Sequence, residues 1–146
     1  MKRLLQTTIV ALLLSAIAAW AGPFEDGVAA QLRGDHANAL QVFRSLAAQG
    51  DANAQNAIGL MYKEGKGVAQ DYVEAVKWWR SAAVQGNAIA QNALGWMYSM
   101  GWGIPQDYAE ALKWWRLAAA KGNANAQFSL GLTYFTGQGV AQDYAE

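Results

Sequence analysis

The sequence predicts an all-α right-handed solenoid of antiparallel helix pairs. Two observations point to this fold: EAVKWWRSAA at residues 74–83 returns as EALKWWRLAA at residues 110–119, and AQNAIGLMY at residues 54–62 returns as AQNALGWMY at residues 90–98. Both pairs are 36 residues apart, a fixed period typical of units that stack on one another. Within each unit the apolar residues recur with helical rather than strand spacing.

The register divides the chain into five segments. Residues 1–21 form a leader, 22–51 a degenerate unit, 52–87 and 88–123 two full units, and 124–146 an incomplete unit. The expected helices span residues 24–33, 36–49, 53–63, 72–85, 88–99, 108–121 and 124–135.

Glycines and aspartates mark the helix ends. The first helix of a unit should end at Gly65 and Gly67, and the second should begin at Asp71, whose carboxylate can accept from free amides of the first turn. Glu74 can reach back to complete a capping box. The second helix should end near Gly86, which suits a left-handed cap. The next unit repeats this pattern with Asp107, Glu110 and Gly122.

The degenerate unit differs from the others in its loop. Phe43 lies 36 residues before Trp79, so the second helix is in register. Gly27 to His36, however, is nine residues where Gly59 to Tyr72 is thirteen. We therefore expect a unit shortened by four residues, with His36 in a structural role.

Residues 1–21 have the organisation of a secretory signal peptide. Two basic residues precede an apolar run that ends in Ala19-Trp20-Ala21, a small-x-small cleavage site. The run is short for a helix that spans a bilayer, which argues against an uncleaved membrane anchor. We expect cleavage after Ala21 and a periplasmic or secreted chain without stable membrane insertion.

Composition and charge exclude several function classes. Hydrophobic residues make up 53% of the chain and charged residues 15%, which favours a packed interior. From Gly22 onward, nine Lys and Arg stand against eleven Asp and Glu, so no nucleic-acid partner is expected. The chain has no cysteine, one histidine and none of the common metalloprotease or serine-hydrolase motifs. We therefore expect no catalytic residue, no metal and no cofactor.

Five short motifs recur from unit to unit. They are the aliphatic-glycine pairs Ile58-Gly59, Leu94-Gly95 and Leu130-Gly131; the tyrosines Tyr62, Tyr98 and Tyr134; the loop glycines Gly65 with Gly67, Gly101 with Gly103 and Gly137 with Gly139; Asp-Tyr; and Trp-Trp. This pattern resembles the Sel1-like repeat family, α-solenoids related to tetratricopeptide repeats. The resemblance covers essentially the whole chain after the leader and implies adaptor roles in protein complexes.

The adjacent tryptophans are expected to serve the fold. Neighbouring residues on a helix point about 100° apart, so one ligand face cannot easily use both. Trp79 and Trp115 lie on a line of alanines and should fill the space beneath the first helix. Trp78 and Trp114 should face a neighbouring unit or lie partly on the outer wall. The alternative is indole stacking on a sugar or an aromatic ligand.

The resemblance to tetratricopeptide units implies that the first helix of each pair lines a concave groove. The positions carried over are Asn56, Leu60 and Lys63, then Asn92, Trp96 and Ser99, then Phe128, Leu132 and Phe135. Trp96 stands where the other units have leucine, so Trp96 and Phe128 are the candidate anchors for a peptide or protein segment. Alternatively, these aromatic side chains fill a seam between repeats.

Two functions remain open. The first is a non-enzymatic interaction scaffold or adaptor in the periplasm or outside the cell. The second is an envelope ligand-binding protein or hydrolase that acts on peptidoglycan-like or β-lactam compounds.

The incomplete last unit supplies the cap of a second helix but not its body. Leu130 and Tyr134 should therefore be partly uncovered. A truncated reading frame or end-to-end self-association would account for this.

Overall fold

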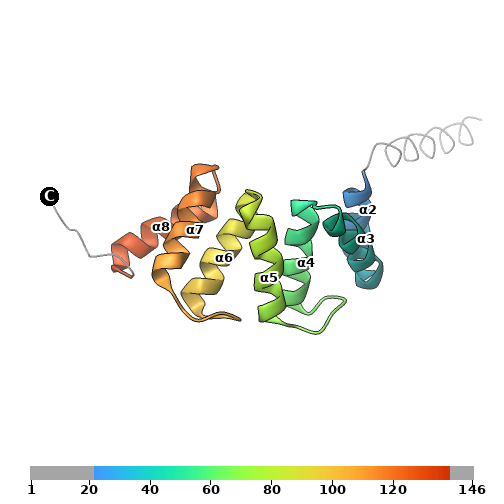
Figure 1. The fold of residues 1–146 in the computed structure, drawn as a ribbon, viewed down its shortest axis with the longest axis horizontal. Coiled ribbons are helices and arrows are strands. Elements are labelled where there is room, and N and C mark those ends of the chain that lie inside the picture. Colours follow the sequence, from blue (N-terminus) through green and yellow to red (C-terminus); the bar gives the residue numbers. More distant parts are fainter. Residues whose placement is uncertain (1–21, 139–146) are drawn as a thin grey trace, which may run out of the picture.

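Seven helices and no strand make up residues 22–138, the part of the chain that the structure, a computed structural model, describes (Figure 1). They are α2 (Pro23–Leu32), α3 (His36–Ala48), α4 (Ala52–Glu64), α5 (Tyr72–Val84), α6 (Ala88–Met100), α7 (Tyr108–Ala120) and α8 (Ala124–Thr136). The all-α prediction is confirmed, and each observed end lies within one residue of its expected position.

The helices form a row in which each packs against the next along the chain (Figure 1). Helix α6 also contacts α8, so first helices of successive units meet along one side of the row. Within residues 22–138, none of the helices has the length and hydropathy to cross a bilayer. The predicted signal peptide lies outside the described residues.

The helix caps confirm half of the predicted capping box. The Asp71 carboxylate accepts from the backbone amides of Val73 (2.9 Å) and Glu74 (3.0 Å). The reciprocal bond from Glu74 was wrongly predicted, because the Asp71 amide already donates to the Tyr62 carbonyl at 3.0 Å. Glu74 instead pairs with Lys77 on the exposed face of α5. The same exchange occurs one unit later, where Glu110 pairs with Lys113.

Each helix pair is held together by an aromatic ring that lies over a glycine. Trp79 is 3% exposed, and a Cβ added to Gly59 would stand 2.8 Å from two atoms of its indole. Trp115 and Gly95 meet in the same way. In the shorter first unit Phe43 takes this place over Gly27. The core role predicted for Trp79 and Trp115 is confirmed, and glycine is needed because these helices approach so closely.

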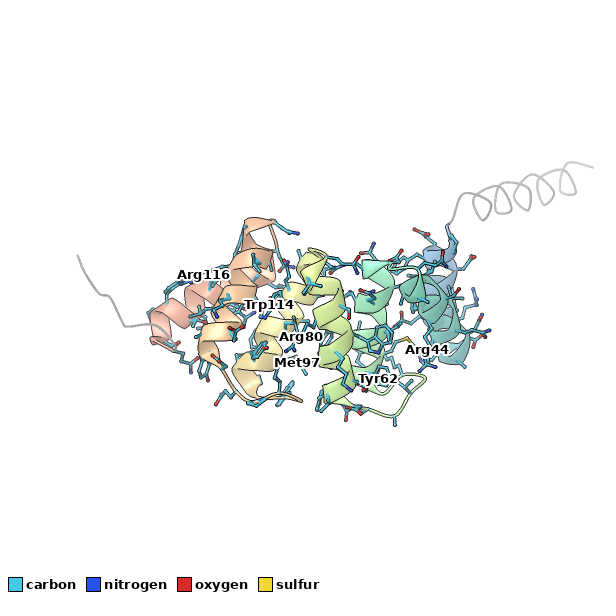
Figure 2. All side chains as sticks on the ribbon, in the orientation of Figure 1. Arg44, Tyr62, Arg80, Met97, Trp114 and Arg116 are labelled. Carbon is cyan, nitrogen blue, oxygen red and sulfur yellow. The ribbon has the colours of Figure 1, made fainter. Side chains whose placement is uncertain are left out.

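The second tryptophan of each pair joins neighbouring units. Trp78 is partly buried against the core cluster formed by residues such as Phe43 and Ile58. Trp114 packs in the same way against the next cluster, which contains Trp79 (Figure 2). The prediction that Trp78 and Trp114 face the seam is confirmed.

An arginine–tyrosine ladder also links the units. Arg80 Nη2 donates to the Tyr98 hydroxyl (2.8 Å), and Arg44 to Tyr62 (3.2 Å). Arg116 does the same to Tyr134 (2.7 Å). Figure 2 marks the three arginines on successive units. The repeated tyrosine was noted in the sequence, but its partner, which also repeats every 36 residues, was not.

We predict that Gly59→Ala lowers the free energy of unfolding by about 1–3 kcal/mol, because the new methyl group would enter the volume of the Trp79 indole. Gly131→Ala is the matched control: it stands in the same register, and no atom of the described residues outside the adjoining helix backbone lies within 4 Å of the added Cβ. There the substitution should raise stability by about 0.5–1 kcal/mol, because alanine favours the helix. Thermal and denaturant unfolding followed by circular dichroism would measure both. Equal effects at the two sites would contradict the packing role.

Candidate functional site

A groove of about 420 Å³ opens between α4 and α6, the first helices of two successive units. Its base is formed by the buried side chains of Trp79 and Met97, and its walls by α4, α6 and the loop that follows α6. Helices α4 and α6 face it together because they occupy equivalent places in the repeat. Figure 2 marks Met97 in the middle of the row.

Five of the residues predicted to face a groove line this one. They are Asn56, Leu60 and Lys63 on α4, and Asn92 and Trp96 on α6. The α4 residues are four and three positions apart, and the α6 residues are four positions apart. This helical spacing places the members of each set along one stripe of their helix. The structure therefore brings both predicted stripes to a common cleft.

Ser99 does not face the groove, which corrects its predicted placement. Its side chain is buried, and its hydroxyl donates to the Trp96 carbonyl at 2.9 Å. Lys63 stands at the equivalent position of α4 and has a longer side chain, and it does line the groove. The short serine side chain turns back to its own helix instead.

The three predicted residues of α8 lie apart from this groove. Phe128 is 69% exposed, Phe135 is 75% exposed, and Leu132 is also exposed. Tyr134 is 46% exposed and Leu130 is partly buried, as predicted for the last described helix. Phe128, Leu132 and Phe135 form a separate apolar surface, which is here called the α8 face.

Three exposed lining residues were missed in the sequence: Ile89, Met100 and Trp102. Trp102 lies in the loop after α6 and stacks on Tyr72 at the start of α5, with ring centroids 5.4 Å apart and an interplanar angle of 23°. Gly103 brings the loop there, because a Cβ at this position would collide with the Tyr72 backbone. One face of Trp102 is thus held by the fold while the side chain lines the groove.

A comparison of equivalent positions would have found these three residues. In the units before and after, Ile89 is replaced by Asn53 and Asn125, Met100 by Glu64 and Thr136, and Trp102 by Lys66 and Gln138. Polar positions in two units are apolar in the third, and all three apolar side chains are more than a third exposed. At these three positions the unit of residues 88–123 therefore has apolar side chains where its neighbours have polar ones.

Trp96 combines a packing role with the predicted groove role. Its indole meets Trp115 of the same unit edge to face, with centroids 5.6 Å apart at 77°, so part of the side chain packs within its own repeat and not in a seam between repeats. The side chain is nevertheless 36% exposed and lines the groove. The fold holds this residue in place while leaving one side of it accessible.

Among the described residues, Lys63 is the one charged residue that lines the groove. The two lysines with a raised pKa lie elsewhere, on exposed faces of α5 and α7. The pKa of Lys77 is raised by its hydrogen bond to Glu74 and then by the charge of that carboxylate. Glu110 acts in the same way on the pKa of Lys113. Both are surface ion pairs of a kind that contributes little to stability.

Comparison with known proteins identifies the repeat. The family model of the Sel1 repeat matches residues 52–87, 88–123 and 124–146. A Sel1 repeat protein from Oxalobacter formigenes has a similar crystal structure, with 34% identity and a TM-score of 0.77 over 82% of this chain and 49% of that one. No curated protein matches the sequence.

A second similar structure is a protective antigen of uropathogenic Escherichia coli strains that displays an SLR fold. It is 40% identical with a TM-score of 0.79, over 90% of this chain and 30% of the antigen. The chain thus spans about half the length of one solved structure and less than a third of the other.

Proposed function

The chain belongs to the Sel1 repeat family, and we propose on this basis that it is a scaffold or adaptor that binds a peptide or protein segment in the groove between α4 and α6. Sel1 repeat proteins generally mediate protein–protein interactions, and the fold is typically a non-enzymatic scaffold. The groove is the part of this chain that can carry such a contact.

The observation that carries the proposal is the exposed apolar surface of Ile89, Met100 and Trp102, at positions that are polar in both neighbouring units. Exposed Trp96, Met100 and Trp102 surround one cleft, although the equivalent positions of neighbouring units are filled by other residues. Aromatic side chains held rigidly and exposed in a pocket are typical of binding hot spots. Asn56 and Asn92 add amide groups that can donate to and accept from a peptide backbone.

We expect Trp96→Ala to reduce recovery of a crosslinked partner from the cell envelope by about tenfold or more, the usual effect of losing a central aromatic anchor. The cost in stability should be well below the ~3–5 kcal/mol expected for Trp115→Ala, because Trp96 is only partly buried. Leu117→Ala, which removes an exposed apolar side chain from α7, is the control.

Unchanged recovery with Trp96→Ala would contradict the groove. So would a loss of stability equal to that of Trp115→Ala, which would make Trp96 another core residue. Binding of muropeptides or β-lactams in place of a protein segment would favour the alternative of an envelope ligand-binding protein or hydrolase.

We also propose that the protein is exported and cleaved after Ala21, because a basic start, an apolar run and a small-x-small site follow one another in residues 1–21. The expected product begins at Gly22 in the periplasm or the medium. N-terminal sequencing and intact mass of the exported protein would measure this. A product that keeps Met1 and stays in the membrane fraction would contradict it.

The α8 face supports a further proposal, end-to-end pairing with a second copy. Its three apolar side chains are exposed, and Gly131 lacks the covering ring that Gly59 and Gly95 have in the described structure. Two copies that meet through the same surface would cover both faces by two-fold symmetry.

We expect a concentration-dependent dimer in sedimentation that the double substitution Phe128→Ser and Leu132→Ser abolishes, because it removes the apolar area available for burial. Leu117→Ser on α7 should leave the dimer intact. A monomer at every concentration, with α8 amides as protected from hydrogen exchange as those of α6, would contradict the pairing.

A further inference from the structure

The charge of the groove suggests which segment it selects. The described residues contribute Lys63 to its lining and no aspartate or glutamate. The other side chains there are apolar, apart from the uncharged Asn56 and Asn92. The groove therefore presents a single positive charge beside a mostly apolar surface.

Lys63 differs from the other lysines of the described residues. Lys66 pairs with Glu64 (2.7 Å), and the Lys121 ammonium donates to the Gly86 carbonyl (2.5 Å). Lys77 and Lys113 each pair with a glutamate on their own helix. Within residues 22–138, the Lys63 ammonium alone among the lysines has neither an ion pair nor a hydrogen bond. Glu64, the acid next to it in sequence, is already paired with Lys66.

A segment that fills the groove would remove water from this ammonium. Lys63 is half-buried already and lines the groove. Burying a charge without a partner is unfavourable, so a segment that offers no acceptor there, or offers a second cation, would bind poorly. A carboxylate in the segment would form an ion pair with the Lys63 ammonium. Specificity follows, because segments without this carboxylate would bind less well.

The source of the carboxylate follows from how the segment binds. A chain that passes through the groove offers carboxylates only on aspartate and glutamate side chains. Lys63 lies one turn beyond Leu60 on α4 and lines the same cleft as Met100 and Trp102. The acidic residue should therefore be close in sequence to the large apolar residues that contact these side chains.

We propose that the groove recognises an apolar segment that carries an aspartate or glutamate side chain, paired with Lys63. The inference rests on the proposed function and adds the chemistry of the partner. It assigns Lys63 a role in specificity, whereas Trp96 and Trp102 provide most of the contact.

The test is selection of a random dodecapeptide library, fused at its C-terminus so that no free carboxylate is present, on immobilised protein. Parallel selections use Lys63→Glu, Trp96→Ala and the control Lys77→Gln, which removes an exposed lysine outside the groove. The unaltered protein and Lys77→Gln should enrich large apolar residues near Asp or Glu. Lys63→Glu should enrich Lys or Arg at the acidic position instead.

The most enriched peptide, synthesised with both ends blocked, provides a double-mutant cycle. Replacing its acid by the amide, or Lys63→Gln in the protein, should each weaken binding about three- to tenfold, as for a partly exposed ion pair. The two changes together should weaken binding no more than either change alone. Circular dichroism confirms that each variant is folded.

The outcomes separate this inference from the proposed function. Suppose that apolar residues are enriched and that Trp96→Ala abolishes this enrichment. If the enriched peptides contain no acidic residue, or if Lys63→Glu selects the same acidic residues as the unaltered protein, the role of Lys63 is overturned and the groove stays in place. A second library, with free C-termini, tests the source of the carboxylate. If only that library yields binders with a carboxylate, the acidic group is the chain terminus and not an aspartate or glutamate side chain. No enrichment, or enrichment unchanged by Trp96→Ala, overturns both proposals.

Discussion

The close approach of an indole to a helix glycine determines the geometry of each repeat. Trp79 can lie this close to α4 only because Gly59 has no Cβ, and the same condition holds for Trp115 and Gly95. Both tryptophans are 3% exposed, so each fills the space between the two helices of its unit. The large area that an aromatic ring buries gives a short helix pair a core of its own.

Once these rings set the distance within a unit, the remaining contacts join one unit to the next. Trp78 and Trp114 pack against the preceding core, and the arginine–tyrosine ladder runs along the row. The loops take part as well, because the backbone at Gly67 and Gly103 lies against the start of the preceding unit's second helix. Stability in such a stack is the sum of units and interfaces.

The sequence was sufficient for the helices and the core because both follow from local patterns. The period of 36 residues, the aspartate caps and the alanine lines around Trp79 give the helix bounds and the buried face. The reciprocal bond of Glu74 was mispredicted because the competing acceptor, the Tyr62 carbonyl, comes from another helix. A local pattern contains no information about a partner nine residues away in the chain.

The groove was predictable in part for the same reason. Helical spacing identified Asn56 and Trp96, but Trp102 is in a loop whose position depends on its stack with Tyr72. Ser99 occupies a groove position by register, but its side chain is short and is buried. Register therefore predicts which positions face a surface, whereas side-chain size and loop packing decide which of them reach it.

The repeat itself provides the comparison that separates folding from function. Asn53, Glu64 and Lys66 show that the fold accepts polar residues at positions where residues 88–123 have Ile89, Met100 and Trp102. Exposed apolar side chains at these positions add little to a core and leave apolar surface in water, so the fold alone does not account for them. Trp96 and Trp102 differ in degree, because their contacts with Trp115 and Tyr72 give them packing roles that Ile89 and Met100 lack. A segment bound in the groove, as proposed above, would account for all four positions together.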